Sequence, residues 1–288
     1  MNRLQLGGVL VSTIVLVAAL LGLTRNAAAP PTAPTLSEAP RGGTTVIVEL
    51  YTSEGCSSCP PADDLLSALQ RSQPVVGARV IALGQHVDYW NRLGWDDAFS
   101  SSEGTRRQRE YATHFGNETI YTPQMIVDGR EEFVGADRAA ALAAIQRASR
   151  RPKAAVTIEP AFSETAREVD QMLRVRIGPL PDVEAREAAD VMLAITESAL
   201  VSEVERGENA GRTLRHDGVV RVLTRIARIP PGHRAETRLE PEIRVDAGWT
   251  GRLAAVIFVQ ERSRRRILGG GELQLPASSP VTGPAERR

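Results

Sequence analysis

The pattern of hydrophobic and polar positions divides the chain into two regions. From residue 44 to about 150, short β-branched and apolar runs alternate with amphipathic segments of helical length. This pattern predicts a strand at Thr44–Tyr51 (TTVIVELY), a helix at Ser57–Arg71 and a second strand at Arg79–Leu83. A strand–helix–strand unit predicts parallel pairing with a right-handed crossover.

The rest of the first region is predicted to contain a loop, two helices and a hairpin. Gly84–Gly104 is polar and aromatic by turns and has no clear period, which is typical of an irregular loop. Asp128-Gly129 between two apolar runs is a strong hairpin signal. The predicted elements are a helix at Thr105–Phe115, strands at Gln124–Val127 and Glu131–Val134, and a closing helix at Asp137–Ser149.

Beyond a boundary near residue 150, only strand-like runs recur. Seven short strands separated by turn signals predict an all-β, sandwich-like domain over 154–276, followed by a disordered tail at 277–288. The predicted strands are Ala155–Ile158, Met172–Ile177, Val191–Ser198, Val219–Ile229, Thr237–Leu239, Leu253–Gln260 and Ile267–Leu275.

The N-terminal segment has the layout of an export signal. Arg3 precedes an uncharged stretch from Leu6 to Thr24, and Arg25 follows it. The length of this stretch fits either a cleaved signal or an uncleaved membrane anchor within 1–26, and 27–43 reads as a linker. Both alternatives place the protein outside the cytoplasm. It would then be periplasmic or extracellular if released, or attached to the inner membrane by a single N-terminal anchor.

Composition and charge narrow the classes of partner. The chain has 35 basic and 35 acidic residues, and its formal net charge is zero. A neutral chain is not attracted electrostatically to nucleic acid or to an anionic membrane surface, so we expect no nucleic-acid partner.

The only two cysteines, Cys56 and Cys59, lie in one Cys-Ser-Ser-Cys motif. Outside the cytoplasm such thiols tend to form disulfides, but a bridge that closes so short a loop stabilises a fold very little. A pair at the start of a helix is instead typical of a redox couple, because the helix end stabilises a thiolate. We expect Cys56 to attack a substrate disulfide and the more buried Cys59 to resolve the mixed disulfide.

Three segments carry a family resemblance: ELYTSEGCSSCPPAD, HVDYWNRLGW and YTPQMIVDGREEFVG. Together they resemble the thioredoxin superfamily, and more closely a family of exported bacterial thioredoxin-like proteins of unknown function. The resemblance implies an α/β thioredoxin-like domain over 44–150, a mixed central sheet with flanking helices, followed here by the all-β sandwich-like domain.

The resemblance also implies roles for single residues. Pro123 matches the cis-proline that faces the cysteines in thioredoxin-like proteins, and the backbone of Thr122 would pair with an extended substrate segment. Glu49 resembles the buried carboxylate that accepts the proton of the resolving cysteine.

The loop that contains HVDYWNRLGW has three interpretations. Trp90 and Trp95 would bind substrate if the loop forms a lip beside the cysteines. Cys56, Cys59 and His86 would be the ligands if the site holds a soft metal such as copper. In the simplest interpretation, the loop only packs beside the cysteines.

The sequence therefore predicts an exported thiol–disulfide oxidoreductase that acts on protein or peptide thiols without a cofactor. Its partners would be protein thiol or disulfide substrates and a redox partner. The alternative is a non-catalytic thioredoxin-like module for binding or copper handling.

Overall fold

The computed structural model describes residues 43–161, 170–181 and 187–276, all of which belong to one unit spanning 39–288. The predicted signal or anchor at 1–26, the linker up to residue 42 and the tail at 277–288 lie outside the described residues. No helix within the described ranges is long and apolar enough to cross a membrane.

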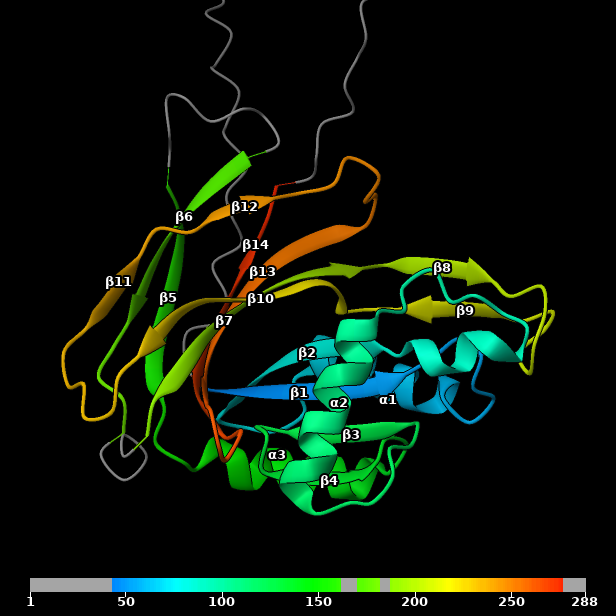
Figure 1. Cartoon of the computed structure of the whole chain (residues 1–288), viewed down its shortest axis with the longest axis horizontal. Helices are drawn as coiled ribbons and strands as arrows, with labels where there is room; N and C mark the ends of the chain where they lie inside the picture. Colours follow the sequence, from blue (N-terminus) through cyan, green and yellow to red (C-terminus); the bar gives the residue numbers. More distant parts are fainter. Residues whose placement is uncertain (1–42, 162–169, 182–186, 277–288) are drawn as a thin grey trace, which may run out of the picture. The chain divides into compact units, whose positions relative to one another are not determined.

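The described residues form a few helices and many strands (Figure 1). The helices are α1 (Pro60–Ser72), the 3₁₀ helix η1 (Asp88–Leu93), α2 (Ser102–Phe115) and α3 (Arg138–Ser149). The strands are β1 (Thr44–Thr52), β2 (Ala78–His86), β3 (Gln124–Val127), β4 (Glu131–Val134), β5 (Ala154–Ala161), β6 (Asp170–Ile177), β7 (Ala189–Ser198), β8 (Leu200–Glu203), β9 (Thr213–His216), β10 (Val219–Ile229), β11 (Thr237–Leu239), β12 (Glu242–Arg244), β13 (Arg252–Glu261) and β14 (Ile267–Gln274).

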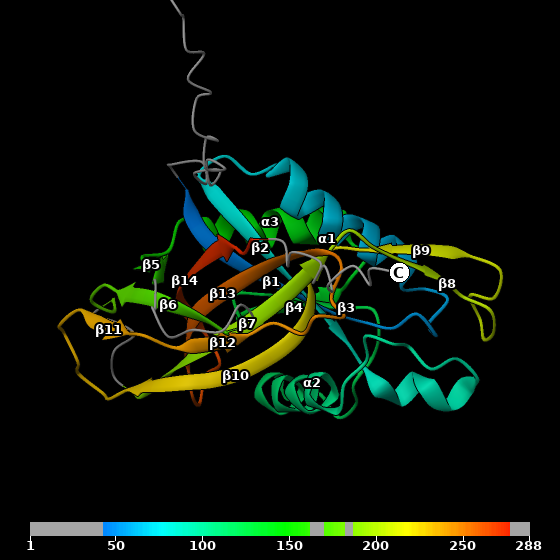
Figure 2. The same cartoon turned by 90° about the horizontal axis from the view of Figure 1, so that it is seen from above.

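The first region is built around β1. This strand pairs in parallel with β2 and antiparallel with β3, and β3 pairs antiparallel with β4. The predicted turn is present, with φ of 52° at Asp128 and 64° at Gly129. Apolar residues of α1 and α3 pack on one face of these strands, whereas Tyr111 of α2 packs on the other. Figure 2 shows α1 and α3 on one side of the strands and α2 on the other.

The later strands extend the same sheet, so they do not form the sandwich-like domain, separate from the first region, that the sequence predicts. β10 joins β2 at Val219 and Gly84, and the order continues β10-β7-β13-β14-β5-β6-β11. A Cβ atom on Gly218 would lie 2.8 Å from the Ala82 carbonyl oxygen, so a glycine is needed where the two regions meet.

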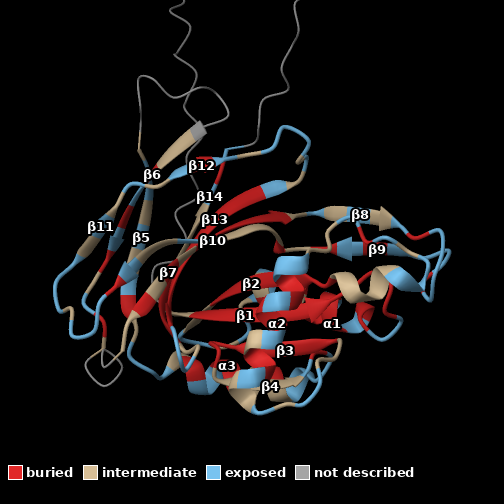
Figure 3. Ribbon diagram, viewed as in Figure 1, coloured by how far each residue is buried: buried red, intermediate tan, exposed pale blue. Residues whose placement is uncertain are grey.

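Sandwich-like packing is nevertheless present within this continuous sheet. Side chains of β5, β6 and β12 share one hydrophobic core with those of β7, β13 and β14. A second core joins the regions, because Ile47 and Leu83 pack against Ala194 and Phe258. Figure 3 shows the buried residues concentrated in β1, β2, β3, β7 and β13.

The helix boundaries agree with the local signals except around two loops. Gly116 ends α2 with φ of 73°, and the Asp137 side chain accepts a hydrogen bond from Ala140 N to cap α3. The predicted loop at Gly84–Gly104 contains η1 and the first turn of α2, which Ser101 caps. The other difference, the start of α1, concerns the cysteines directly.

Candidate functional site

The cysteine motif forms the turn that leads from β1 into α1. Cys56 and Cys59 are joined by a disulfide. The predicted start of the helix at Ser57 is wrong, because α1 begins at Pro60 and Cys59 occupies the N-cap position. Proline fits the first helical turn, where the backbone amides lack intrahelical acceptors. The helix therefore begins after the motif, and Cys59 lies nearer its N-terminus than Cys56 does.

The expected difference in burial between the two cysteines is also wrong. Both have an exposed fraction of zero, although Ser57 and Ser58 between them are exposed. The Cys56 Sγ atom lies 3.4 Å from Ser58 Oγ. Cys56 is thus beside an exposed side chain, whereas Cys59 is followed by the buried Pro60.

A segment of the second region binds the motif. The loop between β8 and β9, residues 204–212, lies beside the start of α1 in Figures 1 and 2. Asn209 is fully buried and its side-chain amide donates hydrogen bonds to the carbonyl oxygens of Glu54 (2.8 Å) and Cys56 (2.9 Å). Glu208 accepts hydrogen bonds from the amide (3.0 Å) and hydroxyl (2.5 Å) of Ser57.

The Thr122–Pro123 peptide bond is cis, as expected, and it lies near the start of α1. A Cβ atom on Gly135 would be 3.0 Å from Pro123 Cβ and 3.1 Å from Ala62 Cβ, so both residues pack against Gly135. Ala62 is one turn beyond the cysteines, because its amide donates to the Cys59 carbonyl at 2.8 Å.

Trp90 connects the proline loop with the cysteine loop. Its indole Nε1 donates to Thr122 Oγ1 at 2.8 Å, and its Cβ lies 3.3 Å from where a Cβ on Gly55 would stand. Trp95 donates from Nε1 to Glu54 Oε2 at 2.8 Å. Both tryptophans are partly exposed. The HVDYWNRLGW loop therefore lies beside the motif, and its tryptophans hold the turn that contains the cysteines.

Glu49 is held by an ion pair. Arg107 donates to both carboxylate oxygens, at 2.6 and 2.8 Å, and Tyr111 OH donates at 2.6 Å. Burial pushes the pKa of Glu49 upward, but Arg107 and Tyr111 outweigh it and hold this pKa below its ordinary value. An ionised, fully paired carboxylate is a poor proton acceptor, so the geometry does not favour the role implied for Glu49 by the resemblance.

A second acidic side chain, Asp63, lies on the same helix as the cysteines. It is four residues after Cys59, and its amide donates to the Cys59 carbonyl at 3.1 Å. Residues four apart share one face of a helix. Burial raises the pKa of Asp63 to about 7, with the charge of His216 acting in the opposite direction. This carboxyl group therefore changes protonation state near neutral pH.

Two histidines form a buried acid–base cluster under the motif. His86 Nδ1 lies 2.7 Å from Asp97 Oδ2, His216 Nε2 lies 3.2 Å from Glu54 Oε1, and the two imidazole rings are 4.9 Å apart. The pKa values of Asp97 and Glu54 are both below their ordinary values. Burial pushes each pKa upward, but the interactions with His86 and His216 help to outweigh it. The Nδ1 atom of His216 is buried without a hydrogen-bond partner among the described residues.

The residues suggested for a metal site are engaged elsewhere. Cys56 and Cys59 are bonded to each other, and His86 is bound to Asp97 and packed against Phe99. Among the described residues, no three His, Cys, Asp or Glu side chains are placed to hold one metal ion.

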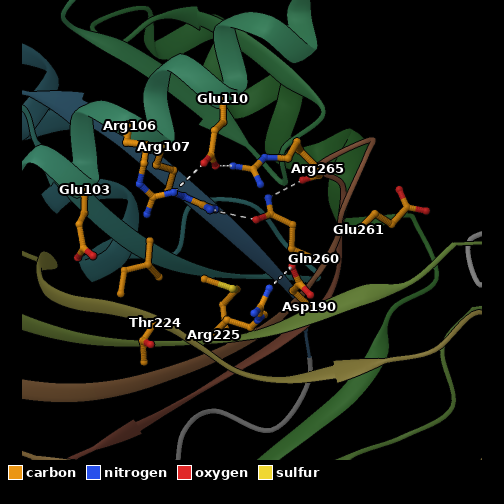
Figure 4. A pocket seen from close by; sticks show the side chains of 12 residues that line it. Glu103, Arg106, Arg107, Glu110, Asp190, Thr224, Arg225, Gln260, Glu261 and Arg265 are labelled. Atoms are coloured by element: carbon orange, nitrogen blue, oxygen red, sulfur yellow. Dashed lines mark hydrogen bonds and ion pairs between the residues drawn. The ribbon is translucent and has the colours of Figure 1, made fainter.

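A cavity of about 350 Å³ lies elsewhere, between α2 and strands β7, β10 and β13 (Figure 4). Three of its four arginines pair with acidic side chains of the lining: Arg106 and Arg265 bind Glu110, and Arg225 lies 3.8 Å from Asp190. Its lining contains no cysteine, histidine or serine. The cysteine turn therefore remains the better candidate for chemistry.

Sequence reasoning missed four residues of the site: Asp63, Asp97, Glu208 and Asn209. Glu208 and Asn209 lie between the predicted strands Val191–Ser198 and Val219–Ile229, in a segment for which the sequence predicted neither a strand nor a role. Tertiary packing alone brings the hairpin to the cysteines, so no local sequence signal could have marked these residues.

The comparisons with known proteins identify a family. A family model described as “Protein of unknown function (DUF1223)” matches residues 47–260. The chain is similar to protein AGR_C_4864 from Agrobacterium tumefaciens, with 26% identity and a TM-score of 0.60, over 81% of this chain and 96% of that one. It is also similar to HBP35 of Porphyromonas gingivalis, with 11% identity and a TM-score of 0.59, over 84% and 78% of the two chains, a likeness of fold alone. No curated protein matches the chain.

Proposed function

The chain belongs to the DUF1223 family, whose function is unknown, and we propose that it is an exported thiol–disulfide oxidoreductase with a thioredoxin-like domain at 44–150. The observation that carries this proposal is the Cys56–Cys59 disulfide at the start of α1, with a cis-proline packed near the same helix. The order β1–α1–β2, then β3–β4–α3, with β3 antiparallel to β1, supports the thioredoxin-like assignment.

The reaction is a two-step exchange. In the reduced protein, the Cys56 thiolate attacks a substrate disulfide, which forms a mixed disulfide and releases one substrate thiolate. The Cys59 thiolate then attacks Cys56 Sγ, releases the second substrate thiolate and forms the Cys56–Cys59 disulfide. Two electrons pass to the substrate, and a dithiol partner returns them. With the opposite supply of electrons, the same steps run in reverse.

Asp63 is the group proposed to serve proton transfer. Its carboxyl is on the helix that Cys59 begins, and its pKa, raised to about 7 by burial, allows it to accept and return a proton near neutral pH. A buried carboxyl group with a raised pKa destabilises the folded state at pH values where it would be ionised in the unfolded chain, and such groups are common at functional sites. Glu49 would then support the fold through Arg107.

Export is part of the proposal and has its own support. Disulfides persist in oxidising compartments, and the cysteines are disulfide-bonded here. Protein or peptide thiols are the proposed substrates. Trp90 packs beside Gly55 of the cysteine turn and donates a hydrogen bond to Thr122, whose backbone is proposed to pair with an extended substrate segment. A separate redox partner is required by the electron balance of the reaction.

One observation favours a second candidate function. Both cysteines have an exposed fraction of zero, which is typical of an inert disulfide in a non-catalytic binding module. The two candidates differ in one property: only an oxidoreductase needs Cys56 to become accessible and to react as a thiolate.

Trapping tests the proposal. A Cys59→Ser variant keeps the attacking sulfur but has no resolving thiol, so it should accumulate a mixed disulfide with a peptide disulfide substrate. The matched control, Cys56→Ser, should accumulate little. Reduced Cys56 should also react with iodoacetamide at mildly acidic pH, where an ordinary thiol reacts slowly. If no mixed disulfide forms on Cys56 and iodoacetamide alkylates Cys56 only as slowly as an ordinary thiol, the result would support the binding module instead.

A further inference from the structure

The loop at 204–212 binds the turn that contains the cysteines, although it is about 150 residues away in the sequence. Two of its side chains hold the turn at 53–59: Asn209 through the carbonyl oxygens of Glu54 and Cys56, and Glu208 through Ser57. Gly207 packs on Trp95, whose Cβ lies 3.3 Å from where a Cβ on Gly207 would stand. Together with the contact between His216 of β9 and Glu54, these bonds join the hairpin to the cysteine turn.

The loop has its own internal structure. Val204 N donates to the Arg212 carbonyl at 3.0 Å, and Gly211 N donates to the Val204 carbonyl at 2.7 Å. The Arg212 guanidinium donates to Asn209 Oδ1 at 2.8 Å, which orients the amide toward the cysteine turn. The loop therefore keeps its shape by contacts that do not involve the cysteines.

The hairpin that carries the loop is separate from the main sheet. β8 and β9 pair only with each other among the described strands. Residues with positive φ flank the hairpin on both sides, Ala199 at 64° and Gly218 at 67°. Displacement of the tip consequently breaks no hydrogen bond of the large sheet. Leu214 and His216 of β9 are buried, whereas the loop tip between the strands is held to the turn by hydrogen bonds, so the tip is the part that opens at a lower free energy than the core.

Access to sulfur is the physical requirement that gives this loop a role. In thiol–disulfide exchange, a third sulfur must approach one sulfur of the disulfide directly. Both cysteines have an exposed fraction of zero, and the loop is bound to the carbonyl of Cys56 itself, so a protein substrate cannot make this approach without a local rearrangement of the structure.

We propose that the loop at 204–212 of the β8–β9 hairpin is a lid on the Cys56–Cys59 disulfide, latched by Glu208 and Asn209, and that it must open before exchange. The proposal rests on the proposed oxidoreductase function for its purpose, but opening itself is measurable without any substrate. A segment of the substrate or redox partner takes the place of the loop tip against the turn at 53–59. The second region thus controls which molecules reach the cysteines.

The rate of disulfide reduction tests the lid. In the oxidised full-length protein, dithiothreitol reduces Cys56–Cys59 to two thiols and is itself oxidised to its cyclic disulfide, and maleimide labelling after acid quenching measures the thiols formed. If opening precedes attack, the observed rate is proportional to the open population. Asn209→Ala loses two buried hydrogen bonds to the turn and should raise the rate about twentyfold, at about fivefold for each bond. Glu208→Ala loses two exposed hydrogen bonds, which are worth less, and should raise the rate about fivefold.

The control is Glu205→Ala, which removes an exposed carboxylate of the same loop. Its rate should equal that of the wild type. Glu208→Gln keeps an uncharged acceptor for Ser57, so its rate should lie between those of the wild type and Glu208→Ala. Glu208 is exposed, so we expect its variants to fold. Circular dichroism and the urea midpoint identify any variant that is unfolded.

Two results would overturn the lid: latch variants with wild-type rates, or a Glu205→Ala rate raised as much as theirs. The outcome is independent of the oxidoreductase test. If the latch variants react faster but Cys59→Ser traps no substrate, the lid stands and the enzymatic proposal fails. If trapping succeeds while the latch variants reduce at the wild-type rate, the enzymatic proposal stands and the lid fails.

Discussion

Replacing Asp63 with asparagine should stabilise the protein in a pH-dependent way. Burial raises the pKa of Asp63 from 3.8 to about 7, so the folded protein binds this proton more tightly than the unfolded chain does. The free energy of unfolding therefore falls as pH rises from about 4 to about 7, and the loss is complete above that range. At about 1.4 kcal/mol for each pH unit, the pKa difference corresponds to about 4 kcal/mol.

Asparagine has nearly the same shape but no proton to lose. Asp63→Asn should thus have the free energy of unfolding of the wild type at pH 3.5 and exceed it by up to about 4 kcal/mol at pH 8. Urea unfolding of the disulfide-bonded protein at several pH values measures the difference, in which groups common to both proteins cancel. Asp64→Asn, on the same helix but exposed, should change the free energy of unfolding by less than about 0.5 kcal/mol.

The reasoning is refuted if the difference between Asp63→Asn and the wild type is constant with pH. It is also refuted if the variant is less stable than the wild type at pH 8. Either result would mean that the carboxylate of Asp63 is already stabilised in the folded protein. Asp63 would then lose the property that makes it a proposed proton carrier for Cys59.

Two further predictions concern the fold around the site. Arg107→Met should destabilise the protein by about 3–5 kcal/mol, because it leaves the buried Glu49 carboxylate unpaired, and the double variant Glu49→Gln/Arg107→Met should recover most of this loss in urea unfolding. A cost below about 1 kcal/mol for the single variant would contradict the ion-pair assignment. Gly129→Ala should lower stability by about 2 kcal/mol or more, since its Cβ would lie 2.0 Å from the Arg265 carbonyl oxygen, and an unchanged thermal midpoint would contradict that contact.

Local signals predicted much of the first region. The β3–β4 hairpin has the predicted bounds because Asp128-Gly129 favours a turn with positive φ at both positions. The caps at Gly116 and Asp137 follow from equally local preferences. The cis bond at Pro123 was expected from family resemblance alone, because proline permits either isomer.

The features that sequence reasoning missed depend on contacts between distant residues. The joining of β10 to β2 depends on the close approach of two glycines, Gly84 and Gly218, which no periodicity reveals. Asp63 and Asp64 are adjacent carboxylates on one helix, and tertiary burial alone distinguishes them. Glu49 was matched to a catalytic position by its place in the motif, but Arg107, 58 residues later, determines its environment.

The position of the β8–β9 hairpin could not be predicted for the same reason. Its loop is polar and would be expected to lie on the surface. Docking against the cysteine turn depends on Asn209, whose amide satisfies two carbonyl groups of a segment about 150 residues earlier. Cys56 is fully buried beside this docked loop, so the expected open cysteine pair is instead a buried one.

Catalysed turnover is the most direct test of the central claim that Cys56 and Cys59 exchange disulfides. A small amount of the protein would be added to a peptide disulfide and an excess of dithiothreitol, with Cys56→Ser as the control, and peptide thiols would be counted over time. The account predicts several thiol pairs released for each protein molecule, above the rate with reductant alone, and no acceleration by Cys56→Ser. A protein whose disulfide is reduced under these conditions but which accelerates nothing would contradict the account.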